Sequence, residues 1–224
     1  MSQTNMMTHY YHLPAQQASS HISSYPHLIA DGLFFVFVFC IVSMTFLSSS
    51  STLFLFSFNS WHVNVDIIGF IIPMLLCLYL IGKTRIEISS VLFGITAVTI
   101  MSFFVTTPVV EKGIVSSFPF SLFPAIIGAM ISLLIISPER KIHRFVYSYC
   151  ISAIGVFIGA DLFHIPSLLF HQPNTPMNAI IGGAGLLDLI FISGIISCLV
   201  LLTSILANNI LESLTHGKFS SVKT

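Results

Sequence analysis

The pattern of apolar and polar positions divides the chain into a polar start and a series of long apolar segments. A helix that crosses a bilayer needs about 20 mostly apolar residues. Six segments approach this length, at about 28–47, 65–82, 88–107, 120–137, 144–165 and 179–208. The pattern therefore predicts an all-α fold, a polytopic transmembrane helix bundle of about six spans. The last segment is too long for one perpendicular crossing, so we expect it to tilt or to leave the membrane at its C-terminal end.

The same pattern predicts three regions: a polar N-terminal tail (1–27), a transmembrane helical domain (28–208) and a cytoplasmic C-terminal tail (209–224). The N-terminal tail has no Lys or Arg, and a secretory signal normally begins with a basic region, so we expect no cleavage. Dispersed histidines without cysteine or carboxylate partners are more typical of a mobile polar tail than of a metal site. We therefore predict neither a metal nor a cofactor, although the tail contains His9, His12, His21 and His27.

Composition supports the membrane assignment and limits the partners. The chain is 55% hydrophobic and only 7% charged, whereas a soluble domain has about a quarter charged residues. The formal net charge is zero, and no basic stripe of the kind that binds nucleic acid is present. The expected partners are membrane lipids, together with a transmembrane peptide substrate or other membrane subunits.

The basic residues predict the orientation of the spans. If the six segments alternate in direction, one side of the membrane receives seven basic residues and the other receives only Lys112. Basic residues collect in cytoplasmic loops. We therefore expect a cytoplasmic (inner) membrane protein of a prokaryote with both termini in the cytoplasm. The seven residues are Lys83, Arg85, Arg140, Lys141, Arg144, Lys218 and Lys223.

Two aspartates lie among glycines inside apolar segments, in "IGADL" (Asp161) and "IGGAGLLDLI" (Asp188). The loop "HQPNTP" at 171–176 separates their two predicted spans, and a short loop joins antiparallel neighbours. At about 1.5 Å per residue, each aspartate lies roughly 15–18 Å of helix from this loop. We therefore expect the two carboxyl groups at similar depth on adjacent helices, in the outer half of the membrane.

Two carboxyl groups in contact in a low-dielectric site share a proton and titrate as a unit. Such a pair activates water in aspartyl proteases and carries protons in transporters. A structural role is the alternative, because a buried aspartate can hydrogen-bond a neighbouring helix. If the last helix starts only at Gly185, Asp188 instead caps it near the interface. His164 shares the helix face of Asp161 and either joins the site or is an interfacial histidine, and Asp66 is expected to start a helix.

Several segments together resemble an uncharacterised prokaryotic family of multi-pass membrane proteins, defined as a domain of unknown function. They are "NVDIIGFIIPMLLCLYLI", "FPAIIGAMISLLI", "GVFIGADLFHIP" and "AIIGGAGLLDLIFISGII", and the resemblance covers about residues 60–205. Its most specific part is the pair "IGADL" and "IGGAG-x-x-D-x-IF". The first segment departs from the family's usual Asn-Val-Gly-Gly, because Asp66 and Ile67 follow Asn64 and Val65. The resemblance implies an integral membrane protein and supplies no reaction.

A weaker likeness is to intramembrane aspartyl proteases of the presenilin and signal-peptide-peptidase kind, which place one aspartate on each of two successive helices. This chain departs from them in three ways. Ala160 stands where they have tyrosine, and Gly185-Leu186-Leu187-Asp188 departs from their Gly-x-Gly-Asp motif. Their Pro-Ala-Leu element follows the aspartates, whereas "PAI" at 124–126 precedes them here.

These observations predict an integral membrane protein with a paired intramembrane carboxylate site formed by Asp161 and Asp188. We interpret it as an intramembrane aspartyl-protease-like hydrolase in which these two residues activate water. The alternatives are a non-catalytic structural or accessory subunit of a larger membrane complex and a proton-coupled transporter. A hydrolase needs water at both carboxyl groups, a transporter needs access that alternates between the two sides, and a subunit should copurify with partners.

Overall fold

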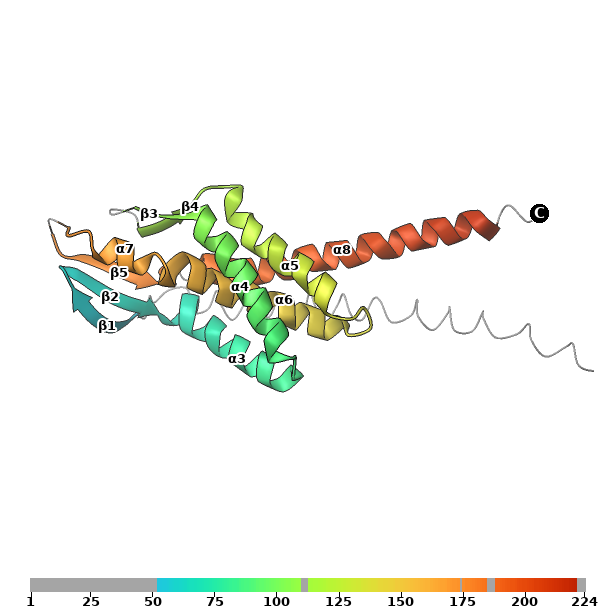
Figure 1. Ribbon diagram of the computed structural model, residues 1–224, viewed down its shortest axis with the longest axis horizontal. Coiled ribbons are helices and arrows are strands. Elements are labelled where there is room, and N and C mark those ends of the chain that lie inside the picture. Colours follow the sequence, from blue (N-terminus) through green and yellow to red (C-terminus); the bar gives the residue numbers. More distant parts are fainter. Residues whose placement is uncertain (1–51, 110–112, 174, 185–187, 221–224) are drawn as a thin grey trace, which may run out of the picture. The chain divides into compact units, whose positions relative to one another are not determined.

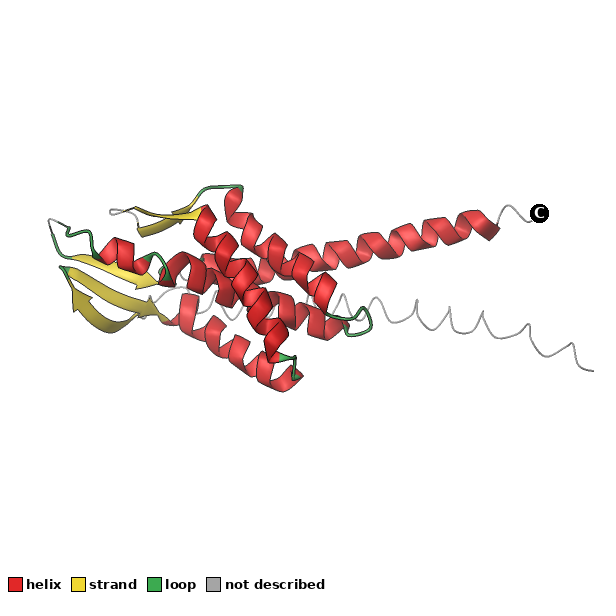
Figure 2. Cartoon of the chain, viewed as in Figure 1, coloured by secondary structure: helices red, strands yellow, loops and turns green. Residues whose placement is uncertain are grey.

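The computed structural model describes residues 52–109, 113–173, 175–184 and 188–220, with side chains of the last stretch described to Leu211. These residues belong to one compact unit that begins at Leu47. Helices form most of it, and the strands gather at one end of the helices (Figures 1 and 2). The predicted first span at 28–47 and the histidines of the N-terminal tail lie outside the described residues.

Within the described ranges, four helices are long and apolar enough to cross a membrane: 67–84, 88–105, 141–169 and 189–211. The first joins the π-helical turn η1 (Ile67–Ile71) to α3 (Ile72–Thr84), and the second is α4 (Ile88–Val105). The third joins α6 (Lys141–Val156), the π-helical turn η3 (Phe157–Leu162) and α7 (Ile165–Leu169). The fourth lies in α8 (Leu189–Ser220). A membrane protein is therefore supported, while exactly six spans are not.

The fourth predicted span, 120–137, is a shorter apolar helix over Phe120–Ile135. It begins with a 3-10 turn, η2 (Phe120–Leu122), and continues as α5 (Phe123–Ile135). At the C-terminus, α8 remains helical to Ser220, so most of the predicted tail at 209–224 is helix.

The prediction of an all-α fold is wrong, because the described residues include five strands. A three-stranded sheet has the order β1 (Thr52–Phe58), β2 (Trp61–Asp66) and β5 (Met177–Ile181). β1 and β2 are antiparallel, and a two-residue turn with positive φ at Asn59 and Ser60 joins them, as in tight hairpins. β5 pairs with β2 in parallel. The hairpin of β3 (Thr106–Val109) and β4 (Gly113–Ser116) forms a second sheet.

The strands occupy the ends of segments that were predicted as membrane helices. β2 takes the start of the predicted 65–82 span, β3 the end of 88–107, and β5 the start of 179–208. Along β2, Trp61, Val63 and Val65 are buried while His62 is exposed. This period of two is the signal of a strand with one buried face.

Small residues allow α6 and η3 to pack closely against α4. A Cβ atom at Gly155 would come within 2.6 Å of Val98 Cβ, and one at Gly159 would meet the backbone carbonyl of Thr99. Glycines at this spacing are typical of close helix packing in membranes. Gly155 and Gly159 therefore serve helix packing.

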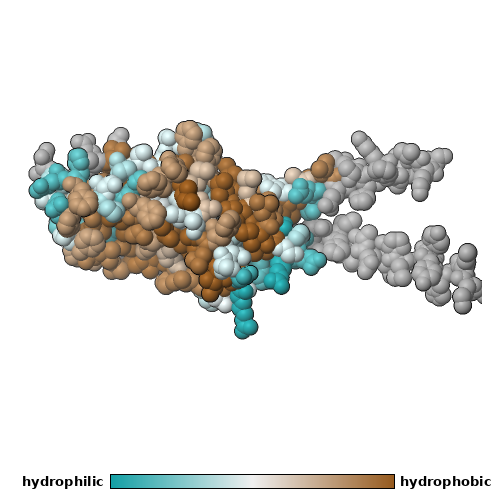
Figure 3. All heavy atoms as spheres, in the orientation of Figure 1, coloured by the Kyte–Doolittle hydropathy of each residue, from teal (hydrophilic) through white to brown (hydrophobic). Residues whose placement is uncertain are grey.

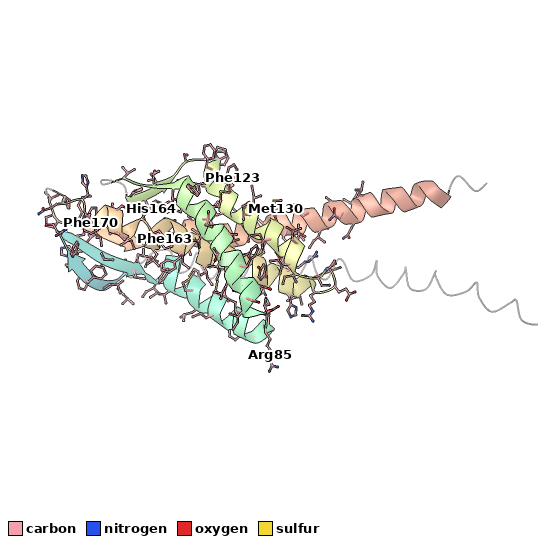
Figure 4. All side chains as sticks on the ribbon, viewed as in Figure 1. Arg85, Phe123, Met130, Phe163, His164 and Phe170 are labelled. Atoms are coloured by element: carbon pink, nitrogen blue, oxygen red, sulfur yellow. The ribbon has the colours of Figure 1, made fainter. Side chains whose placement is uncertain are left out.

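Apolar side chains cover the helical part of the surface, and polar residues lie toward its ends (Figure 3). Side chains such as Leu78, Phe93 and Phe104 are more than half exposed, as suits contact with lipid. The turns between α3 and α4 and between α5 and α6 carry the basic residues. Both turns lie at the end of the helices away from the strands, and Arg85 projects from the first of them (Figures 1 and 4).

Candidate functional site: two aspartates on one cavity

Asp161 lies in the π-helical turn η3, which widens the helix immediately after α6. The wide turn is visible in the hydrogen bond from Phe163 N to Ile158 O, which spans five residues at 3.0 Å. Gly159 and Ala160 are buried beside it. The Oδ2 atom of Asp161 is buried and accepts no hydrogen bond from the described part of the chain. Single π-helical turns within α-helices are frequent at functional sites.

Asp188 precedes the first residue of α8 and caps this helix. Its Oδ1 atom accepts a hydrogen bond of 2.9 Å from Ile190 N. The assumption of regular helix through "GGAG" was therefore wrong, because residues 182–184 form a turn after β5. The alternative, in which Asp188 is a helix cap, is the arrangement found.

Despite this difference, both aspartates line one cavity of about 370 Å³. Liquid water occupies about 30 Å³ per molecule, so the cavity has room for several waters or for part of a substrate. Four hydroxyl side chains share the lining, and the rest of it is mostly apolar; the four are Thr106, Ser116, Ser121 and Ser193.

His164 is not among the residues that line this cavity. Its ring stacks on Phe103, with the centroids 4.7 Å apart and the planes 9° from parallel. Its Nε2 atom donates to the carbonyl oxygen of Phe103 at 3.3 Å. Figure 4 shows it beside Phe163, where η3 gives way to α7. Asp161 and Asp188 therefore line one cavity, whereas His164 packs against Phe103 of α4.

The hydroxyl residues that line the cavity were not predicted from the sequence. Thr106 and Ser116 are cross-strand partners in the β3–β4 hairpin, and their hydroxyls donate to Ser102 O and Val105 O. A donating hydroxyl keeps its oxygen lone pairs for a water or a substrate N–H. Ser193 follows Asp188 by five residues, a spacing that does not place two side chains on one helix face, so no local pattern pointed to it.

No group of three His, Cys, Asp or Glu side chains within the described ranges could hold a metal ion. Asp66, which was expected to start a helix, does so: its Oδ1 atom accepts hydrogen bonds from Ile68 N and Gly69 N. It is buried at the end of β2.

Comparison with known proteins gave one match. A family model described as "Protein of unknown function (DUF1614)" matches residues 14–200. No curated protein and no solved structure matches the chain.

Proposed function

The chain belongs to the family described as Protein of unknown function (DUF1614), and from its site we propose that it is an intramembrane aspartyl hydrolase that cleaves a peptide bond within a transmembrane segment. Asp161 and Asp188 would activate the attacking water. The single observation that carries the proposal is that both carboxyl groups line the same cavity.

The surroundings of the two groups give each a role. A backbone N–H donor favours the ionised form of a carboxylate, and Ile190 N donates to Asp188, so Asp188 takes a proton from water. Asp161, whose buried oxygen accepts no described hydrogen bond, holds a proton and donates it to the carbonyl oxygen of the substrate. Attack then gives a tetrahedral intermediate. Its collapse breaks the C–N bond and passes a proton to the departing amine.

The chemistry of the lining indicates the substrate. Apart from the two carboxyl groups and the hydroxyls, the cavity is bordered by apolar residues of α6, α8 and β4, including Val156, Ile114 and Ile196. These suit the apolar side chains of a transmembrane peptide. The hydroxyl oxygens of Ser116 and Thr106 are placed to accept hydrogen bonds from its backbone once the helix has unwound.

A cleavage assay in liposomes tests the proposal. The purified protein is reconstituted with a single-span peptide, and the products are identified by mass spectrometry in water enriched in ¹⁸O. We expect cleavage within the apolar segment and one ¹⁸O atom in the new carboxyl terminus. A panel of such peptides that all stay intact would contradict the proposed activity.

The proposed location is the cytoplasmic membrane, with both termini in the cytoplasm, because the basic turns at 83–85 and 140–144 lie at one end of the helices and basic residues favour the cytoplasm. A reporter fused after Thr224 should report the cytoplasm, and a reporter inserted within 171–176 should report the outside. Opposite results at both positions would reverse the proposed orientation. Reporters on the same side at both positions would contradict the proposed number of spans.

A further inference from the structure

Asp66 caps the N-terminus of the first described span, 67–84. Its side chain is 5% exposed, and its Oδ1 atom accepts from Ile68 N at 2.8 Å and from Gly69 N at 2.7 Å. These two bonds fix the first residues of η1 directly after β2. Without them, two backbone N–H groups at the start of a helix would lose their partner.

The turn that leads to Asp188 rests on this same helix start. β2 and β5 are parallel, with Val65 opposite Ile181, so Gly182 follows Ile181 as Asp66, the last residue of β2, follows Val65. Gly182 has a φ of +71°, and a Cβ atom on it would lie 2.8 Å from both Gly69 C and Phe70 N. The backbone at Gly182 therefore packs directly on the backbone that Asp66 caps.

Two residues after Gly182, the chain reaches the cavity at Ala184. Ala184 and Asp188 line the same cavity. A path of packed backbone thus leads from the Asp66 cap, through η1 and the turn at 182–184, to the cavity that Asp188 lines.

We propose that Asp66 is a positioning residue for Asp188, which it holds at the cavity by capping the helix turn on which Gly182 rests. The inference rests on the proposed function for its catalytic consequence, but the geometric part stands independently of any activity. It assigns a role to a third buried carboxylate that does not line the cavity.

A spin-label distance measurement tests the geometric part. Labels are placed on cysteines at Ala184 and at Ile142, an exposed position near the start of α6, after the four native cysteines have been replaced by alanine. We expect one distance with Asp66 present and a second or shifted distance after Asp66→Ala. Asp66→Asn and Asp66→Ser should keep the original distance, because Asn and Ser are also good N-cap residues.

Substitution of Gly182 provides an independent test of the same inference. Gly182→Ala leaves the Asp66 cap intact but forces a Cβ atom into the η1 backbone, so it should reproduce the altered distance. Gly82→Ala is the matched control, because a Cβ atom there meets nothing within 4 Å. Glu87→Ala controls for loss of an acidic side chain at a helix start, since Glu87 makes no cap hydrogen bond.

Each outcome decides the inference. An unchanged distance in Asp66→Ala would overturn it, and so would a changed distance in folded Asp66→Asn and Asp66→Ser, which would show that charge and not capping matters. If Asp66→Ala does not fold, the Asn, Ser and Gly182→Ala variants decide the question in the same way.

Once a peptide that the protein cleaves has been identified, Asp66→Ala should lower kcat about 100-fold with KM unchanged, as expected for a misplaced catalytic group. Asp66→Asn should keep the kcat of the parent protein. Absence of all cleavage would contradict the proposed hydrolase and leave the distance result standing.

Discussion

Replacement of Asp161 or Asp188 by asparagine should abolish peptide cleavage while the protein still folds and inserts. An amide can neither take a proton from water nor give one to the substrate carbonyl. Loss of one member of a catalytic group that acts as a unit typically costs a factor of about 10⁴ or more. The liposome assay would measure this loss, and the double variant should be no worse than either single one.

Stability of the same variants separates catalysis from a structural role. Asp188→Asn keeps the cap of α8, because Asn ranks with Asp at this position. Asp161→Asn removes a carboxyl group whose buried Oδ2 atom lacks a described partner, and relief of such strain is stability-neutral or stabilising. Thermal unfolding should therefore match that of the parent. Loss of folded protein in both variants would favour the structural interpretation.

Glu87→Gln is the matched control for these two variants. Glu87 is an exposed acidic residue at the start of α4, and the cavity residue Thr106 lies at the opposite end of that helix. We expect full activity and unchanged unfolding. A loss of activity here as large as in Asp161→Asn would show that removal of any acidic group is harmful.

Replacement of Gly159 by alanine should destabilise the protein by about 1–3 kcal/mol, the usual cost of overpacking a tight contact. The new Cβ atom would meet the backbone carbonyl of Thr99 and come within 2.8 Å of Ser102 Cβ on α4. A helix backbone cannot give way as a flexible side chain can. Because Gly159 lies two residues before Asp161, the shift should also lower cleavage activity.

Unfolding in detergent measures the effect of Gly159→Ala, with Gly82→Ala as its control. Both glycines lie in helices, but a Cβ atom at Gly82 has nothing within 4 Å. We therefore expect Gly82→Ala to keep the parent's stability and activity. Equal stability of the two variants would contradict the close packing of η3 on α4.

The sequence allowed prediction of apolar helices but not of the strands at their ends. Hydropathy averaged over a span hides the alternation of Trp61, Val63 and Val65, which is short and merges into the apolar run that follows. The parallel pairing of β2 with β5 joins residues more than 100 positions apart. No local pattern could predict that pairing, which depends on how the helices pack.

That Asp161 and Asp188 approach one cavity could be predicted, because the Pro-rich loop at 171–176 separates the two apolar segments that contain them. The local structure around Asp188 could not, since it depends on the positive φ of Gly182 and on the turn that replaces helix. The hydroxyls of Thr106 and Ser116 reach the cavity only through the β3–β4 hairpin. The position of these two hydroxyls at the cavity therefore depends on tertiary packing.

Infrared titration of the carboxyl groups tests the central claim most directly. If Asp161 and Asp188 form one pair, the protein should show a protonated carboxyl band near pH 7, because two charges in contact in a low-dielectric site are costly and one shared proton satisfies both. The band should vanish in Asp161→Asn and in Asp188→Asn and persist in Asp66→Asn, whose parent carboxylate accepts two backbone hydrogen bonds. A band that is absent from the parent protein, or that survives in either dyad variant, would contradict the account.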